Sequence, residues 1–152
     1  MKRICVFPGS FDPITLGHED IVRRAMLLFD EIIIGIGENS EKKYLFPLEK
    51  RMKWISNVFS GEKNIRVMNY KGLTIDFCKQ NGARFLLRGL RSSSDFEFER
   101  SIAQMNQAIA KDIETVFLIS RPEYSAMAST LVRDIYRNGG DVSLFLPLGV
   151  DL

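Results

Sequence analysis

The chain has 152 residues, of which 45% are hydrophobic and 26% charged, and these values are typical of one globular domain rather than of a disordered chain. The formal net charge of +2 is too small to indicate general nucleic-acid binding, and no apolar run approaches the roughly 20 residues that cross a bilayer. We therefore expect a single domain over residues 1–152, in the cytoplasm, with no nucleic-acid or membrane partner.

The first half of the chain alternates short apolar runs with amphipathic patterns. Residues 4–7 form an apolar run that predicts a strand, and apolar residues at helical spacing follow over 21–29. The run at 32–36 does not alternate apolar with polar residues, which is typical of a strand covered on both faces. A second amphipathic pattern over 48–59 predicts a helix, and the run at 65–68 predicts the third strand.

The second half continues the same alternation. A short helical pattern around 73–77 is expected to stop at Gly82, because glycine readily ends helices. Strands are predicted at 85–87 and 116–119, with a helix over 98–109 between them. A last helix is expected to begin near Ser129 and to end at 138–140.

This order of elements predicts an α/β fold: a Rossmann-like, doubly wound, five-stranded parallel sheet with helices on both faces. Open sheets of this kind bind ligands beyond the carboxyl ends of their strands, where the strand order reverses. The segments that should form a site are therefore those after each strand, at 8–18, 38–47, 70–74, 88–95 and 120–130.

The loop after the first predicted strand has unusual chemistry. Pro8 and Pro13 restrict its backbone, and Gly9 and Gly17 allow tight turns or the close approach of a ligand. His18 directly precedes a helical pattern, and at such a helix start the backbone N–H groups and the helix dipole favour an anion. A lone histidine often simply faces solvent, but the rigid loop favours a functional one here.

Basic residues follow two other predicted strands. Lys42 lies after the second, where a surface role and a functional role are about equally supported. Arg88 continues an apolar strand, where an unpaired charge would be costly, and Arg91 follows it closely. Arginine offers a planar fork of donors that suits phosphate oxygens. Ser94 or Asp95 is expected to cap the next helix.

Two further groups of residues have simpler explanations. Ser129 and Thr130 are good helix-start residues, so capping alone explains them, although a helix start is also a natural phosphate site. Cys5 and Cys78 each lie in an apolar stretch and are expected to be buried thiols. With one histidine in the chain, a zinc site is not expected.

Three motifs together carry a resemblance to a known family. The segment Gly-Ser-Phe-Asp-Pro-Ile-Thr-Leu-Gly-His at 9–18 resembles the first motif of the nucleotidyltransferase superfamily. Threonine at position 15, in place of a first histidine, is similar to the phosphopantetheine adenylyltransferases. The arginine-glycine-x-arginine element at 88–91 and the serine-threonine-x-x-arginine element at 129–133 are also similar to that family.

The resemblance implies transfer of the adenylyl group of ATP to 4′-phosphopantetheine, giving dephospho-coenzyme A and pyrophosphate, by direct in-line attack of the acceptor phosphate on the α-phosphate. It implies that His18 stabilises the transition state with Lys42 and Arg91. It implies that the acceptor contacts Ser10, Lys42, Thr74 and Arg88. It further implies that ATP contacts Ser10, Phe11, His18, Gly89, Leu90, Arg91, Glu99, Tyr124, Ser125, Ala126, Met127, Ala128, Ser129 and Thr130.

The same resemblance implies Mg²⁺ that arrives with ATP, since the sequence shows no dedicated acidic metal cage. It also implies a hexamer and feedback binding of coenzyme A. Position 128 carries alanine where the family often has serine, so Ala128 is given no side-chain role.

Other functions stay open from the sequence. A nicotinamide mononucleotide adenylyltransferase or a cytidylyltransferase would share the Gly-His turn, but these usually carry a histidine at the position of Thr15. A non-catalytic ATP-binding sensor would bind ATP without releasing pyrophosphate. A flavodoxin-like redox carrier shares the predicted fold, although the first strand is not followed by a Gly-x-Gly-x-x-Gly turn.

Overall fold

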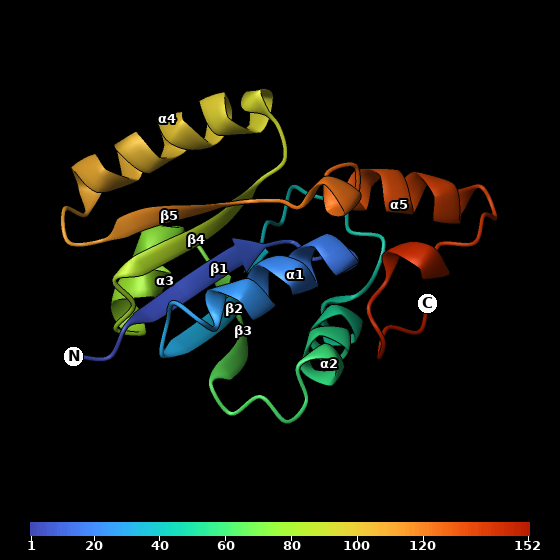
Figure 1. The fold of residues 1–152 in the computed structure, drawn as a ribbon, viewed down its shortest axis with the longest axis horizontal. Helices are drawn as coiled ribbons and strands as arrows, with labels where there is room; N and C mark the ends of the chain where they lie inside the picture. Colours follow the sequence, from blue (N-terminus) through green and yellow to red (C-terminus); the bar gives the residue numbers. More distant parts are fainter.

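The structure is a computed structural model that describes residues 1–152. Strands and helices alternate along the chain (Figure 1). The strands are β1 (Ile4–Gly9), β2 (Glu31–Glu38), β3 (Ile65–Lys71), β4 (Phe85–Leu90) and β5 (Glu114–Ile119). The helices are α1 (Leu16–Ala25), α2 (Leu48–Val58), α3 (Thr74–Gln80), α4 (Ser93–Ile109) and α5 (Ser129–Arg137), with short 3₁₀ segments η1 (Pro122–Tyr124) and η2 (Ser143–Phe145).

The five strands form one parallel sheet in the order β3-β2-β1-β4-β5. The chain builds outward from β1 through β2 to β3, and then returns to the other side of β1 with β4 and β5. This confirms the predicted doubly wound, Rossmann-like sheet. The strand order reverses between β1 and β4, so the loops after these two strands diverge and leave a crevice at their carboxyl ends.

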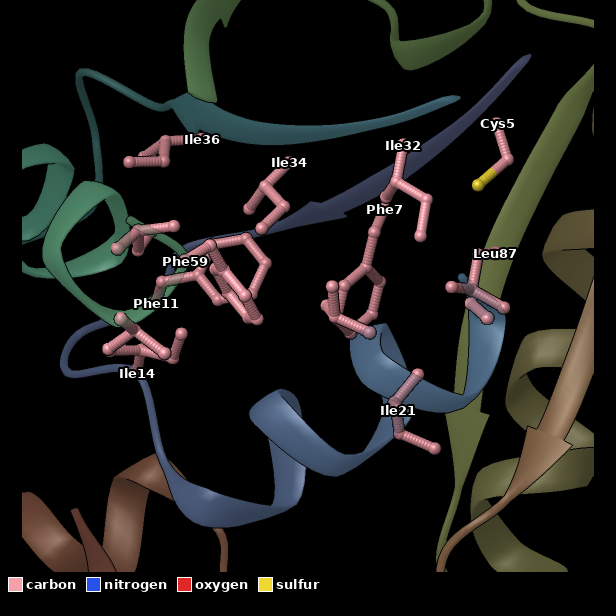
Figure 2. Packing of buried hydrophobic residues seen from close by; sticks show 14 of the residues in the cluster. Cys5, Phe7, Phe11, Ile14, Ile21, Ile32, Ile34, Ile36, Phe59 and Leu87 are labelled. Carbon is pink, nitrogen blue, oxygen red and sulfur yellow. The ribbon is translucent and has the colours of Figure 1, made fainter. Parts of the chain in front are cut away.

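Helices cover both faces of the sheet, as predicted. Alternate side chains of β1 point to opposite faces: Phe7 packs in a cluster with Ile21 of α1, and Val6 packs in a cluster with Ile75 of α3. Figure 2 shows the first cluster, in which Phe7 and Ile21 lie between β1 and α1. Because β2 is covered on both faces, its run of isoleucines needs no alternation with polar residues.

Both cysteines are buried, as expected. Cys5 belongs to the cluster under α1, and Cys78 belongs to the cluster under α3. Burial raises the pKa of both thiols to about 12, so the reactive thiolate is scarce at neutral pH.

The ends of several helices test the predicted caps. Gly82 follows α3 with a positive φ of 66°, which confirms that this helix stops there. The predicted cap of α4 is wrong: Ser92 is the N-cap, and its hydroxyl accepts the Asp95 N–H at 3.2 Å. The Asp95 carboxylate instead accepts from the backbone N–H and the guanidinium of Arg91, in the loop before the helix.

α5 begins at Ser129, as predicted, but its cap differs from expectation. Ala128 is its N-cap and makes no side-chain cap bond. Ser129 is the first helical residue, and its hydroxyl donates to the Pro13 carbonyl at 2.9 Å. Ser129 therefore ties α5 to the loop after β1 instead of capping its own helix, and Thr130 accepts from Arg133 at 3.2 Å.

The predicted apolar face of α4 is present but largely uncovered. Phe98, Met105 and Ile109 are each more than half exposed. The helix lies along β4 and β5 (Figure 1), and most of its apolar face is open to solvent. No helix, α4 included, has both the length and the apolar character of a membrane span.

Candidate active site

Two cavities lie at the crevice between the carboxyl ends of β1 and β4. Cavity A has a volume of about 380 Å³, and cavity B has a volume of about 260 Å³. Both cavities are lined by Pro8 and Gly9 of β1, by Arg88 of β4 and by Glu99 of α4. Two ligands that occupied them would therefore meet beside Arg88.

Cavity A brings together every residue predicted to bind the acceptor, namely Ser10, Lys42, Thr74 and Arg88. The Lys42 ammonium donates to the Ser10 hydroxyl at 2.8 Å across the cavity rim. The Thr74 hydroxyl lies 2.8 Å from the Tyr70 hydroxyl, which holds it in one orientation. The far end, between α4 and the sheet, is lined by Ile102, Ala103 and Asn106. Cavity A thus has a basic mouth and a more apolar interior.

Cavity B gathers most residues predicted to bind the nucleotide. It is lined by His18, Gly89, Arg91, Glu99, Tyr124, Met127, Ala128, Ser129 and Thr130. The first turns of α1 and α5 both border this cavity, through Gly17 and His18 and through Ser129 and Thr130. Their free backbone N–H groups make this a favourable place for phosphate oxygens.

Some of the residues predicted to bind the nucleotide do not line cavity B. Phe11 is 3% exposed and packs edge-on against Phe7 and His18, so its side chain belongs to the core (Figure 2). Leu90 is also buried, and Ser10 lines cavity A. Ser125 and Ala126 are exposed beside cavity B without lining it. A contact between ATP and these residues stays a prediction.

His18 is held as a neutral ring. It lies within the first turn of α1, not before it, and the backbone N–H of Thr15 donates to its Nδ1 at 3.0 Å. Because Nδ1 accepts this bond, the proton of the neutral ring is on Nε2. Burial, together with the charges of Arg91 and Arg88, lowers the pKa of His18 to about 4. The ring therefore offers an N–H donor to cavity B at neutral pH.

Arg88 is paired, which explains how an apolar strand tolerates it. Its Nε and Nη2 donate to the two Glu99 carboxylate oxygens at 2.9 and 2.6 Å, and its Nη1 donates to the Pro8 carbonyl at 2.8 Å. Glu99 is 8% exposed. This fork-to-fork pair fixes the plane of the guanidinium between the two cavities.

Sequence reasoning missed several residues of the site. Asp12 and Arg51 are buried charged residues that bond to the loops after β1 and β2, and neither was singled out. The predicted segments 38–47 and 70–74 contribute the predicted Lys42 and Thr74, and also residues that were not named in advance. Cavity A is also lined by Glu38, Asn39, Tyr44, Tyr70 and Asn106.

No group of three or more His, Cys, Asp or Glu side chains in the structure could hold a metal ion. Glu99 and Asp95 are the carboxylates beside cavity B, and both are engaged by arginines. The side chains present therefore do not form a cage for a resident cation, and any metal here would need ligand oxygens from elsewhere.

Comparison with known proteins agrees with this geometry. The family model for cytidylyltransferase-like proteins matches residues 6–135. In structure, the chain is similar to a bifunctional NMN adenylyltransferase/ADP ribose pyrophosphatase from Francisella tularensis, complexed with AMP and a manganese ion. The TM-score is 0.70 at 16% identity, over 96% of this chain and 44% of that one, which concerns the fold alone. Fold and family thus define a protein of the cytidylyltransferase-like class.

Closer relatives narrow the class. The chain is 54% identical to a phosphopantetheine adenylyltransferase of Flavobacterium psychrophilum, over 97% of both chains. It is 50% identical to the protein of the same name from Cytophaga hutchinsonii, over 97% of this chain and 98% of that one. The chain belongs to the phosphopantetheine adenylyltransferase family.

Proposed function

We propose that the protein transfers the adenylyl group of ATP to 4′-phosphopantetheine, with ATP in cavity B and the acceptor in cavity A. The single observation that carries this proposal is the junction of the two cavities at Arg88 and Glu99, beyond the carboxyl ends of β1 and β4. The apolar side chains of Leu86, Ile102 and Ala103 in cavity A suit a pantetheine chain, and the basic Lys42 and Arg88 suit its terminal phosphate.

The reaction is one displacement. An oxygen of the acceptor phosphate forms a bond to the α-phosphorus of ATP as the bond from that phosphorus to the bridging oxygen breaks. The products are dephospho-coenzyme A and pyrophosphate. Because the nucleophile is already an anion at neutral pH, the step needs no general base and no nucleophilic side chain. The obstacles are repulsion between anions and alignment of the two substrates.

The residues of the site address both obstacles. Lys42 and Arg88 would hold the acceptor phosphate, and Arg91 and the first turn of α5 would hold the ATP phosphates. The Nε2–H of His18 would donate to the charge that develops on the α-phosphate in the transition state. In-line alignment supplies up to roughly 7–11 kcal/mol in favourable cases. A donor aimed at developing charge supplies about 3 kcal/mol.

Mg²⁺ would arrive with ATP, held by phosphate oxygens, because the protein has no carboxylate cluster for it. The ion would offset the triphosphate charge and stabilise the leaving pyrophosphate. The side chains of cavity B would then orient the phosphates through N–H donors alone.

Three finer features of the proposal concern the protein beyond its site. We place it in the cytoplasm. We expect a homo-oligomer, and the resemblance to the family implies a hexamer. The exposed apolar face of α4 supports association between copies of the chain. Coenzyme A contains the acceptor's pantetheine moiety, so feedback binding of coenzyme A at cavity A is part of the proposal.

The test is pyrophosphate release from ATP and Mg²⁺, with 4′-phosphopantetheine or with nicotinamide mononucleotide as the acceptor. We expect release only with phosphopantetheine, together with dephospho-coenzyme A. Release only with nicotinamide mononucleotide would overturn the acceptor assignment. Bound ATP with no pyrophosphate from either acceptor would instead identify a non-catalytic sensor.

A further inference from the structure

Two buried charged residues lie outside both cavities, and the transfer step described above does not use them. Asp12 follows β1 and Arg51 lies in the first half of α2, and each is only 2% exposed. Buried charges are costly unless they are well bonded, and an apolar pair of similar size would pack here without that cost. Their bonds show what their burial achieves.

The bonds of these residues join two loops. The Asp12 carboxylate in the first loop accepts the backbone N–H groups of Leu45 and Phe46 in the second, at 2.8 and 2.9 Å. The Arg51 guanidinium donates to the carbonyl of Phe46 at 2.9 Å and to the carbonyl of Ser10 at 2.8 Å. Each charged group therefore bridges to backbone atoms, and the loops after β1 and β2 cannot separate without breaking these bonds.

The two charges also compensate each other. Burial lowers the pKa of Arg51, while the charge of Asp12 raises it. Arg51 also lies over the Tyr44 ring, 4.1 Å from its centroid, and the Tyr44 hydroxyl accepts from the Asn39 N–H and donates to the Gly37 carbonyl. The second loop is thus fixed at both of its ends.

Lys42 lies in the middle of this second loop, on an otherwise exposed stretch. Its ammonium reaches the Ser10 hydroxyl at 2.8 Å, at the mouth of cavity A. Lysine has a long, flexible side chain, so the position of its ammonium depends on where the backbone of the loop is held. In the second loop the backbone contacts of Asp12 and Arg51 fall on Leu45 and Phe46, shortly after Lys42, and in the first loop Arg51 holds the carbonyl of Ser10 itself.

We infer that Asp12 and Arg51 are positioning residues that form a clasp between the two loops and set the Lys42 ammonium against the acceptor phosphate. This inference rests on the proposed function. The clasp contacts neither substrate and acts through Lys42. Loss of the clasp should lower kcat roughly 10- to 100-fold, because a displacement of about 1 Å at a reacting group has effects of this size.

A double-mutant cycle separates positioning from simple destabilisation. Asp12→Asn keeps the shape but puts an amide N–H₂ against one of two backbone N–H donors, and Lys42→Ala removes the group that the clasp holds. We expect Asp12→Asn to lower kcat in the parent and to have almost no further effect in Lys42→Ala. Independent, multiplicative losses, or an unchanged kcat in Asp12→Asn, would overturn the inference.

Arg51→Lys keeps the charge and can replace Asp12→Asn in the same double-mutant cycle with Lys42→Ala. If Asp12→Asn does not fold, this second cycle tests the positioning role. Ile55→Val, a buried change on the same helix, is the control for stability: it should lower the Tm without lowering kcat. Lys43→Ala is the control for charge on the same loop and should also leave kcat unchanged.

Hydrogen exchange of the free protein tests the clasp without turnover. In the parent, the amides of Leu45 and Phe46 should be protected from exchange. Both Asp12→Asn and Arg51→Lys should raise the exchange rate over residues 39–46, with little change in the strands of the sheet. Unprotected amides in the parent would contradict the clasp itself. An inactive parent with protected amides would contradict the proposed function and leave the clasp standing.

Discussion

At the scale of single residues, the protonation state of His18 is the main feature of the candidate site. The Thr15 N–H holds Nδ1, so the ring enters the reaction as a neutral donor instead of as a cation or a base. In the proposed reaction Lys42, Arg88 and Arg91 would already supply full positive charges near the reacting phosphates, and a neutral donor would add a directed hydrogen bond without a further one.

His18→Ala should lower kcat about 100- to 1,000-fold, the usual effect of removing one donor to a developing oxyanion. The fold should survive, since the change removes one side of a capping box worth about 1 kcal/mol. Steady-state kinetics and a thermal melt are the measurements. Glu19→Gln, on the next residue of the same turn, is the control and should keep the parent kcat.

The lowered pKa of His18 also makes a prediction about pH. The folded pKa is about 4 and the ordinary value is 6.5, so between these values the unfolded chain binds a proton that the folded chain does not. The contribution of His18 to stability is therefore complete above about pH 6.5 and is lost as pH falls toward 4. The Tm of the parent relative to that of His18→Gln should be lower at pH 4.5 than at pH 7, and a Tm difference that does not change with pH would contradict a neutral ring.

At the scale of elements, β4 and α4 act together through the pair of Arg88 and Glu99. The strand supplies a guanidinium at the junction of the two cavities, and the helix supplies the carboxylate that fixes its plane. Glu99 was predicted to contact ATP. Its observed partner is Arg88, and a carboxylate that neutralises an arginine also lowers the cost of burying it in an apolar strand.

Arg88→Ala should weaken binding of 4′-phosphopantetheine more than binding of ATP. Arg88 lines both cavities, but in the proposed function its guanidinium holds the acceptor phosphate, and its loss leaves Glu99 as an uncompensated anion near that phosphate. Calorimetry should show a loss of acceptor affinity of roughly 10-fold or more. Arg84→Ala, at an exposed position directly before β4, is the control. Equal acceptor affinities in parent and Arg88→Ala would rule out this role.

The elements themselves were largely predictable from the sequence. Every predicted strand lies within an observed one. Runs such as 32–36 are apolar throughout, which is typical of a strand that helices cover on both faces of the sheet. Helix ends were less predictable. Ser92, Ser94 and Asp95 are all good caps by type, and only the path of the loop from Arg91 decides among them.

The clasp could not be predicted for a similar reason. Arg51 falls in an amphipathic helix among charged neighbours, and nothing local marks it as buried. Its partners are the backbone atoms of Ser10 and Phe46, which become visible only once β1 and β2 are paired. The site residues that could be predicted, such as His18 and Arg88, lie near the carboxyl end of a strand or at the start of the helix that follows one.

At the scale of the whole molecule, the sheet order brings separate loops to one crevice. The loops after β1 and β4 diverge at the switch point, and α5 returns to the same place through the Ser129–Pro13 bond. Distant segments of the chain thereby form cavity B together. The remaining surface feature at this scale is the uncovered apolar face of α4.

That face predicts association in solution. Phe98 is 68% exposed and Met105 is 67% exposed, and water contact of such side chains is unfavourable. The double change of Phe98→Lys and Met105→Lys should reduce the assembly to a smaller species in analytical ultracentrifugation. Leu27→Lys changes an exposed leucine elsewhere and should leave the assembly intact. A monomeric parent at micromolar concentration would contradict the prediction.

The central claim is that the adenylyl group passes directly from ATP in cavity B to the acceptor in cavity A. The most direct test follows the configuration at the α-phosphorus with ATP that carries one sulfur of defined configuration there. A single in-line displacement predicts inversion in the dephospho-coenzyme A product. Retention would require two displacements through a covalent intermediate on the protein, and it would contradict this account.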